Sequence, residues 1–522
     1  MNEQLPDQTT ERPRILIVDN NSQFPRSARL LVERSLHFEP KFEQSTRDTI
    51  MNGDSTSTRQ KALALNLDAT RYGTFAEIGG GQEVARWFFS VGGAAGTIAE
   101  TISAYDMAMS DRRYGPAKRY VSRERLEAML KHEFAQLLEG LKEKHGDTKR
   151  FFAFANTVAT RGFRKAGNGR GWLGIRFQTR PGEEPSEVII HTHLLDSTAA
   201  LEQEALGILG VSLVHAAFFH YEDPAKFIAS LMDDLSRGRV EIDVIKFSGP
   251  AFSGLDSRLM TLQLVEQGLT DAAMFTAAGD VVQPSEMLYK KPILVERGSF
   301  RPATNLTLDL LERAREQFLE EPEVRGKVTV VLAEMTLRSL TPGSEGGHDD
   351  FLDRADILRS LGFDVLISRF EQHYQLAEYL AAYTDGLIGI AAGLPTVRQQ
   401  VADEKYYTEL PGGVLESVGR LFKRSVKMYV YPTRDPATGE IRTLANAKTP
   451  APWHHLRHLL IELGRIVPIR SYNESYLSIQ TPDVLSRIQK GDASWETMVP
   501  RVVAETIKAK RLFSNTKSKE EP

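Results

Sequence analysis

The sequence predicts an α/β protein with two compact regions, of which the second is a doubly wound parallel sheet. Three observations predict this class. The chain has 522 residues, more than one ordinary core needs, so two or more domains are expected. Hydrophobic residues make up 41% of the chain and charged residues 26%, as in globular proteins. Short apolar segments alternate with longer helical ones in the second half, which is typical of parallel strands joined by helices.

Shifts in composition suggest the domain boundaries. Residues 1–58 are mostly polar, and we expect a mostly flexible N-terminal appendage. Residues 59–285 are expected to form a mixed α/β domain, whose role the sequence does not give. Residues 286–515 are expected to form the second α/β domain, and the charged residues 516–522 a disordered tail.

Glycines separate the first predicted elements of the 59–285 region. Gly79, Gly80 and Gly81 precede a predicted helix, and a second glycine-rich turn at 92–96 precedes another helix, expected to run through Tyr105. Further strands are predicted at 150–160, 171–178, 187–195, 240–247 and 270–275, and further helices at 199–220 and 255–267.

The 286–515 region shows the strand–helix alternation most clearly. Strands are predicted at 292–295, 327–333, 364–367, 387–390 and 428–431. Helices are predicted at 306–318, 349–361 and 376–383. The glycine at 362 ends one of these helices, as a C-terminal capping residue commonly does.

The segment GSFRPATNLTLDLLERA, residues 298–314, joins a short apolar strand to a predicted helix. A glycine turn lets backbone come close to a phosphate, and a helix N-terminus supplies free N–H groups with partial positive charge. The segment resembles the opening motif of nicotinamide and nicotinate mononucleotide adenylyltransferases. The resemblance implies a Rossmann-like, nucleotidyltransferase-like fold, with Gly298, Ser299, Phe300 and Thr304 at the nucleotide phosphates.

The resemblance breaks at the catalytic position. Where that family has a histidine that stabilises the charged transition state, this chain has Thr307. A threonine hydroxyl donates one neutral hydrogen bond and cannot supply the cationic donor of an imidazolium. The resemblance therefore implies a catalytic role for Thr307, but with a weaker group than the family uses.

A second motif of the same family has its counterpart near the C-terminus, in SIQTPDVLSRIQKGDASWETMVP, residues 478–500. The resemblance implies that Ser478 and Thr481 bind nucleotide. The family's arginine position is occupied by Val484, and Arg487 is the nearest substitute for a catalytic cation.

From about residue 60 onward, the chain also resembles a family of uncharacterised bacterial proteins that carry the label nicotinamide or nicotinate mononucleotide adenylyltransferase, or sometimes TonB-dependent receptor. The shared stretches include FFAFANTVAT and QPSEMLYKKPILVERGSFRP. We expect the receptor label to be wrong, because the chain lacks a signal peptide and a series of ten-residue alternating strands.

The resemblance implies adenylyl transfer from ATP, with Mg²⁺, to nicotinamide or nicotinate mononucleotide or a related phosphorylated acceptor, as in NAD biosynthesis. Two alternatives remain open. In the first, the chain is a catalytically weak or inactive nucleotide-binding or regulatory protein. In the second, it is an unrelated enzyme whose site lies at the second candidate phosphate loop, Gly79, Gly80 and Gly81.

Several partner classes are not expected. A formal net charge of −4 argues against nucleic acid, and the absence of cysteine excludes disulfides and thiolate metal sites. No apolar run is long enough for a membrane helix, and no signal peptide is recognised, so a cytoplasmic location is predicted. His191 and His193 have the spacing of metal ligands, but no third ligand is evident, so a structural role is expected and no metal site is predicted. The oligomeric state stays open.

Overall fold

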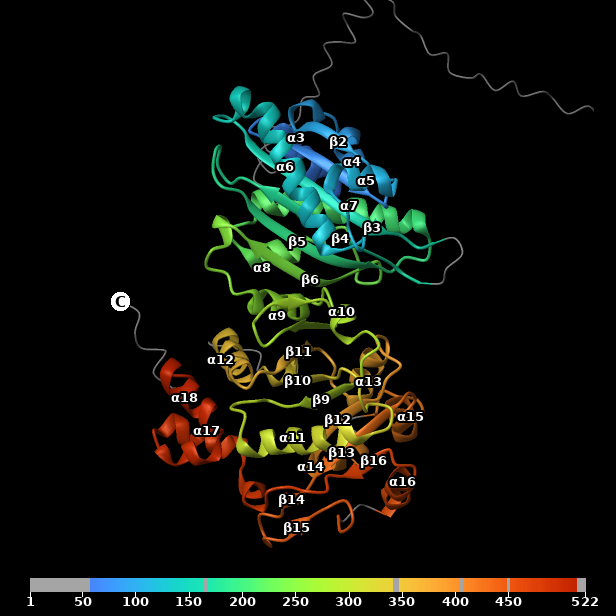
Figure 1. The fold of residues 1–522 in the computed structure, drawn as a ribbon, viewed down its shortest axis with the longest axis vertical. Coiled ribbons are helices and arrows are strands. Elements are labelled where there is room, and N and C mark those ends of the chain that lie inside the picture. Colours follow the sequence, from blue (N-terminus) through green and yellow to red (C-terminus); the bar gives the residue numbers. More distant parts are fainter. Residues whose placement is uncertain (1–56, 163–166, 341–346, 403–406, 448–450, 514–522) are drawn as a thin grey trace, which may run out of the picture. The chain divides into compact units, whose positions relative to one another are not determined.

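The computed structural model describes residues 57–162, 167–340, 347–402, 407–447 and 451–513. Nearly all of the predicted appendage, 1–58, and the whole predicted tail, 516–522, lie outside the described residues. The described part of the chain is α/β and contains two large sheets, as predicted (Figure 1). Within it, no helix combines the length and the apolar character needed to span a membrane.

The first sheet has six strands in the order β2-β1-β3-β4-β5-β6. Its first three strands are parallel, and β3 to β6 are antiparallel neighbours in sequence order. The strands are β1 (Arg71–Ile78), β2 (Ile98–Ile102), β3 (Arg150–Ala159), β4 (Gly169–Phe177), β5 (Ser186–Leu194) and β6 (Val240–Ser248).

Helices cover both faces of this sheet. One hydrophobic cluster joins one face to helices that include α4, α7 and α9, and a second cluster joins the other face to α6. The helices of this region are α3 (Thr58–Leu67), α4 (Glu83–Val91), α5 (Met107–Tyr114), α6 (Arg123–His145), α7 (Ala199–Phe219), α8 (Pro224–Ser230) and α9 (Ser257–Glu266), with one-turn 3₁₀ helices η1 (Ala94–Gly96) and η2 (Pro250–Phe252).

One predicted element in this region is wrong. The helix expected after the 92–96 turn is instead strand β2, which pairs in parallel with β1. Its sequence, IAETI, is rich in β-branched residues, which fit a pleated surface better than a helix. Helix α6 was not expected from the sequence; it has 23 residues, and its buried face packs on β3 and β4.

The second sheet has eight strands in the order β16-β13-β12-β9-β10-β11-β7-β8. The six strands from β16 to β11 are parallel, and β7 and β8 are antiparallel additions at one edge. These two strands precede residue 285 in sequence but pair in the second sheet. The strands are β7 (Ala272–Phe275), β8 (Val281–Val282), β9 (Ile293–Arg297), β10 (Val330–Thr336), β11 (Asp364–Ser368), β12 (Ile388–Gly393), β13 (Val426–Tyr431) and β16 (Ile466–Pro468).

The strand order of the parallel part reverses beside β9. After β9 the chain adds β10 and β11 on one side, then returns to add β12, β13 and β16 on the other. Numbered in sequence, these six strands stand in the order 3-2-1-4-5-6. The carboxyl ends of β9 and β12 are therefore neighbours, and the chain continues from β9 to β10 on one side and from β12 to β13 on the other.

Helices cover both faces of the second sheet as well. Clusters containing α11 and α12 lie on one face, and a cluster containing α13, α15 and α16 lies on the other. The helices are α10 (Pro284–Leu288), α11 (Asn305–Glu320), α12 (Gly347–Ser360), α13 (His373–Ala381), α14 (Leu394–Ala402), α15 (Gly413–Leu421), α16 (Ala451–Glu462), α17 (Thr481–Lys490) and α18 (Arg501–Lys510), with η3 (Leu337–Ser339), η5 (Glu474–Ser478), η6 (Ala493–Met498) and the hairpin β14 (Thr433–Arg434) and β15 (Ile441–Arg442).

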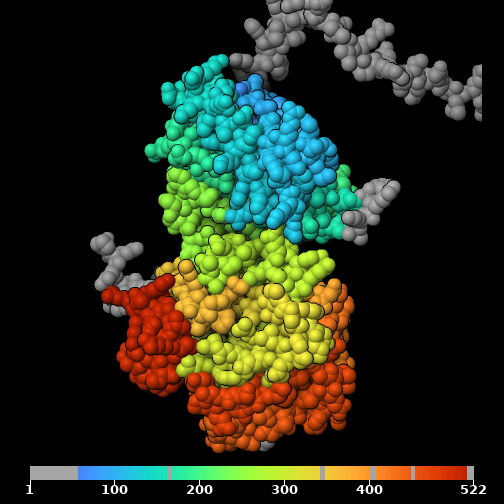
Figure 2. All heavy atoms as spheres, in the orientation of Figure 1, coloured from blue at the N-terminus to red at the C-terminus, as the bar shows by residue number. Residues whose placement is uncertain are grey.

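The last two helices pack at the side of this sheet. Figure 2 shows the C-terminal residues, in red, against the surface that contains α12. The side chain of Asp353 on α12 accepts a hydrogen bond from the backbone N–H of Phe513, 2.9 Å away, and Lys510 pairs with Asp356 at 2.7 Å. These contacts hold the C-terminal segment against α12, close to the loop between β9 and α11.

Candidate functional site

The loop between β9 and α11 folds back on itself. The backbone N–H of Gly298 donates to the carbonyl oxygen of Glu334 on β10, 3.1 Å away. Phe300 takes a left-handed backbone conformation, with φ of 48°, and its buried ring lies against Gly298. A Cβ at Gly298 would lie 2.9 Å from that ring, so glycine is required by the close approach. Ser299 is left exposed at the turn.

A capping box begins α11. The buried Thr304 hydroxyl accepts from the backbone N–H of Thr307 at 3.3 Å, and the Thr307 hydroxyl accepts from the backbone N–H of Thr304 at 3.3 Å. This reciprocal pair satisfies two backbone donors that a helix N-terminus would otherwise leave open. The hydroxyl that sequence analysis assigned to catalysis is therefore directed at the backbone of its own helix. A catalytic role for Thr307 stays a prediction.

A buried ion pair joins β9 to β10 at the point where this loop begins. Arg297, the last residue of β9, donates from two guanidinium nitrogens to the carboxylate of Glu334 on β10, at 2.8 Å each. Ser368, at the end of β11, donates to the same carboxylate at 2.6 Å. Since Glu334 is fully buried, these bonds fix the carboxyl ends of three adjacent strands and neutralise the charge of Arg297.

Two further arginines lie beside the loop. Arg354, buried on α12, donates to the carbonyl oxygens of Ser299, 3.2 Å away, and Ser339, 2.9 Å away. Its guanidinium and that of Arg301 both pair with Asp350, the latter at 2.6 Å. Burial lowers the pKa of Arg354, against the raising effect of Asp350. Arg301 and Arg354 thus share one carboxylate next to Ser299.

Glu296 is a buried acid that the sequence analysis missed. It is 7% exposed on β9, where its register neighbours are Ala333 on β10 and Ala391 on β12. Its Oε2 atom has no hydrogen-bond partner among the described residues, and burial raises the pKa of this carboxyl well above the ordinary value. A glutamate in the otherwise apolar run ILVE was the available clue, because an acidic residue in a buried strand is rare without a partner.

The structure brings the two motif segments together. Phe300 and Ala303 belong to the same hydrophobic cluster as Ile479 and Trp495 of the C-terminal segment. The side-chain amide of Asn305 donates to the backbone oxygen of Thr497, 3.0 Å away. In Figure 1 the N-terminal end of α11 accordingly lies beside α17.

The individual C-terminal candidates occupy less central positions. Thr481 is the first residue of α17, and Ser478 is exposed, with its hydroxyl donating to the backbone oxygen of Ser475 at 3.3 Å. Arg487 pairs with Asp483 at 3.0 Å on its own helix and donates to the Ser494 hydroxyl at 2.7 Å. Its guanidinium is thus engaged locally, and its role as a catalytic cation stays a prediction.

A hollow of about 650 Å³ lies along the first turns of α11. It runs between that helix and residues 471–476, and its lining includes Asn305, Asp309 and Asn473. Asp309 accepts from the Tyr431 hydroxyl and from the backbone N–H of Asn473, which ties this helix face to β13 and to the segment before η5. The volume lies within the range of small-molecule sites.

At the second candidate phosphate loop, a carboxylate of the chain itself already accepts hydrogen bonds from the helix that follows. Gly79, Gly80 and Gly81 follow β1 and precede α4. Two N–H groups in the first turn of α4 already donate to the Glu77 carboxylate, from Val84 at 3.2 Å and from Ala85 at 2.9 Å. Burial raises the pKa of Glu77 to about 7. A side chain at Gly79 would collide with the backbone oxygen of Val158. Close packing accounts for this loop, and a phosphate there would meet a carboxyl group.

Comparison with known proteins adds no family. No protein-family model and no curated protein matches the chain. Among solved structures, a competence/damage inducible protein CihA from Agrobacterium tumefaciens is 16% identical, matching 30% of this chain and 94% of its own, with a TM-score of 0.23. A competence-damaged protein (CinA) superfamily protein from Escherichia coli is 13% identical over 32% of this chain and 96% of its own, with a TM-score of 0.22. At such TM-scores these likenesses carry no argument about fold or function.

Proposed function

We propose that the second sheet is a Rossmann-like, nucleotidyltransferase-like domain that binds the phosphates of ATP at the loop Gly298–Thr304. The strand order carries this proposal. In open α/β sheets, ligands bind outside the carboxyl ends of the strands at the point where the order reverses. Here that point lies between β9 and β12, and the loop in question leaves the carboxyl end of β9.

Local chemistry supports the same location. The loop leads into the N-terminus of α11, a 16-residue helix whose dipole and free N–H groups favour an anion. Arg301 and Arg354 add positive charge beside the exposed Ser299. The hollow along α11 offers room for a second small molecule.

The reaction this domain type would perform is adenylyl transfer. A phosphate oxygen of nicotinamide mononucleotide, nicotinate mononucleotide or a related acceptor attacks the α-phosphorus of ATP. The bond to the β-phosphate oxygen breaks, and pyrophosphate leaves. Mg²⁺ would neutralise the phosphate charge, while the protein mainly positions the groups and stabilises the charge that develops.

One observation favours binding without rapid turnover as a second candidate function. The Thr307 hydroxyl is engaged in the capping box and is neutral, and Arg487 is paired on its own helix. Losing one preorganised donor typically costs roughly 10²–10³ in rate. A site of this kind suits a protein that senses a nucleotide.

Calorimetric titration with ATP–Mg²⁺ tests the proposed site. Ser299→Asp places a negative charge at the exposed turn, so we expect ATP affinity to fall about tenfold or more. Ser253→Asp, at an exposed serine after η2 on the other sheet, is the matched control and should leave affinity unchanged. Equal affinity in all three proteins, or no ATP binding, would overturn the proposal.

A pyrophosphate assay then decides between enzyme and binding protein. The same proteins are incubated with ATP–Mg²⁺ and each mononucleotide, with Thr307→His alongside. Release of pyrophosphate with formation of the dinucleotide, increased in Thr307→His, supports adenylyl transfer. ATP binding without release of pyrophosphate, from the wild type or from Thr307→His, supports the nucleotide-binding function.

A further inference from the structure

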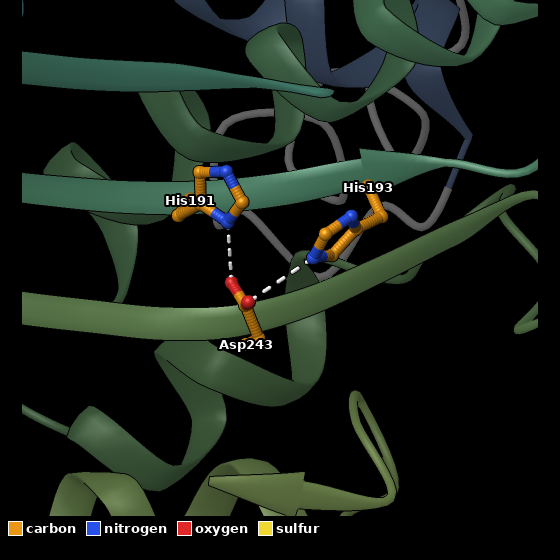
Figure 3. A group of neighbouring side chains, drawn as sticks. All are labelled: His191, His193 and Asp243. Carbon is orange, nitrogen blue, oxygen red and sulfur yellow. Dashed lines mark hydrogen bonds and ion pairs between the residues drawn. The ribbon is translucent and has the colours of Figure 1, made fainter. Parts of the chain in front are cut away.

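Three side chains of the first sheet converge on one face. His191 and His193 lie on β5, and Asp243 lies on the neighbouring β6 (Figure 3). Their ligand-capable atoms, one from each residue, all lie within 4.8 Å of one another. Asp243 is the third ligand that the sequence analysis did not find.

A β-bulge places Asp243 on this face. In the ladder between β5 and β6, His191 pairs with Val244, but the next residue, Thr192, pairs with Ile242. Asp243 is thus the extra residue on β6. In a regular ladder Asp243 would pair with Thr192, and its side chain would lie on the opposite face of the sheet from the two histidines. The bulge turns it toward the two histidines, and re-aiming a side chain is a common use of bulges.

Both histidine rings contact the carboxylate of Asp243. His191 Nδ1 is 2.5 Å from Asp243 Oδ1, and His193 Nε2 is 3.1 Å from Asp243 Oδ2. His191 and Asp243 are buried, whereas the His193 side chain is 21% exposed. Asp243 has no lysine or arginine partner among the described residues.

An outer partner completes the group. The side-chain amide of Gln283, which precedes α10, lies 2.9 Å from His191 Nε2. Rotation of that amide by 180° puts its carbonyl oxygen at the same place, where it accepts the Nε2–H and leaves Nδ1 with a free lone pair. Metal-bound histidines almost always donate their second ring N–H to such an acceptor.

We propose that His191, His193 and Asp243 bind a divalent transition-metal ion, of the class of Zn²⁺ or Fe²⁺. Two imidazoles and one carboxylate suit these ions and do not suit Mg²⁺ or Ca²⁺, which prefer all-oxygen sites. Three protein ligands leave at least one position for water or a substrate, on the exposed side of His193. This site is on the other sheet from the proposed nucleotide loop and stands independently of it.

Cobalt provides the test, because Co²⁺ substitutes for Zn²⁺ and its visible absorption reports the ligands. The full-length protein, freed of metal with a chelator, is titrated with Co²⁺ while absorption and tryptophan fluorescence are recorded. The Trp172 ring lies 4.9 Å from the His191 ring, so a paramagnetic ion there should quench its emission. We expect one ion per chain, displaced by Zn²⁺.

Variants identify the ligands. Asp243→Asn and His193→Ala should each weaken Co²⁺ binding by about 100-fold, and Gln283→Leu by about 10–100-fold. The control is His454→Ala with His458→Ala on α16, where two exposed rings lie 4.5 Å apart, one helical turn from each other. His193→Ala changes the most exposed ligand and should keep the fold, checked by circular dichroism.

The outcomes separate cleanly. Retained Co²⁺ binding in the α16 variant together with loss in His193→Ala supports the site. Binding that survives His193→Ala, binding lost only in the α16 variant, or no binding at all would overturn it, and the triad would then be a buried hydrogen-bonded histidine–aspartate group.

Discussion

The hydroxyl of Thr307 accepts a hydrogen bond from the backbone N–H of Thr304, 3.3 Å away, and the Thr304 hydroxyl accepts one in return from the N–H of Thr307. The residue standing at the expected catalytic position is thereby part of the start of its own helix. This arrangement fixes the backbone at the start of α11. It also makes the position sensitive to changes that have nothing to do with catalysis.

Thr307→Ala should destabilise the protein by about 1 kcal/mol, because one side-chain acceptor at the helix start is lost. Thr307→Ser keeps the hydroxyl and is the matched control, expected within about 0.5 kcal/mol of the parent. Urea denaturation followed by circular dichroism measures both. Equal stability of the alanine and serine variants would show that the Thr307 hydroxyl contributes nothing to the capping box.

Glu296→Gln should stabilise the protein at pH 8, by about 1–3 kcal/mol, the range for a buried group left without a partner. Because burial raises the pKa of Glu296 in the folded state, its contribution is fully present below the ordinary carboxyl pKa and is lost as pH rises. The gain in Glu296→Gln should therefore grow from pH 5 to pH 8. Glu312→Gln, at an exposed site on α11, should show no such trend.

Glu77→Gln should destabilise the protein by about 1–3 kcal/mol at pH 5. Both oxygens of Glu77 face donors, the N–H groups of Val84 and Ala85 and the amide of Asn156. The hydroxyl oxygen of the protonated carboxyl at pH 5 still has lone pairs to accept from them, whereas the NH₂ group of a glutamine has none. The pKa of about 7 means that the wild-type advantage declines as pH rises from about 4.5 through 7. Denaturation curves at pH 5 and pH 8 measure this, with exposed Glu139→Gln as the control. A deficit that increases with pH would contradict the assignment.

Arg354→Lys should destabilise the protein by about 1.5–3 kcal/mol, because a lysine ammonium cannot reach both backbone oxygens and Asp350 in the same fork geometry. The loop at Ser299 would lose its link to α12, so ATP affinity should fall in parallel. Arg359→Lys, exposed on the same helix, is the control. Equal loss of affinity in both variants would contradict the role of the loop contact.

Much of the second sheet was predictable from the sequence. Its apolar strands are fully buried, so they stand out as continuous runs between helical segments; the strand expected at 292–295 is observed at Ile293–Arg297, and the helix expected at 306–318 at Asn305–Glu320. The position of β7 was not predictable, because a strand's sequence does not state which sheet it joins. A short β-branched segment such as β2 is compatible with either a helix or a strand, and only its pairing with β1 shows that it is a strand.

The side-chain sites were less predictable, for two physical reasons. Asp243 reaches the histidines only through a bulge, and a strict alternation of two residues places it on the wrong face. Thr307 and Glu77 hydrogen-bond to backbone N–H groups, and such contacts depend on the exact path of the chain between strand and helix. The spacing of the motif residues gives the path only approximately.

Hydrogen–deuterium exchange with and without ATP–Mg²⁺ tests the central proposal most directly, because it locates the nucleotide without assuming catalysis. The amides of residues 298–308 should exchange more slowly when ATP is present, with little change at residues 78–86. Slower exchange at 78–86 with unchanged exchange at 298–308 would contradict the account and place the nucleotide at the glycine loop of the first sheet.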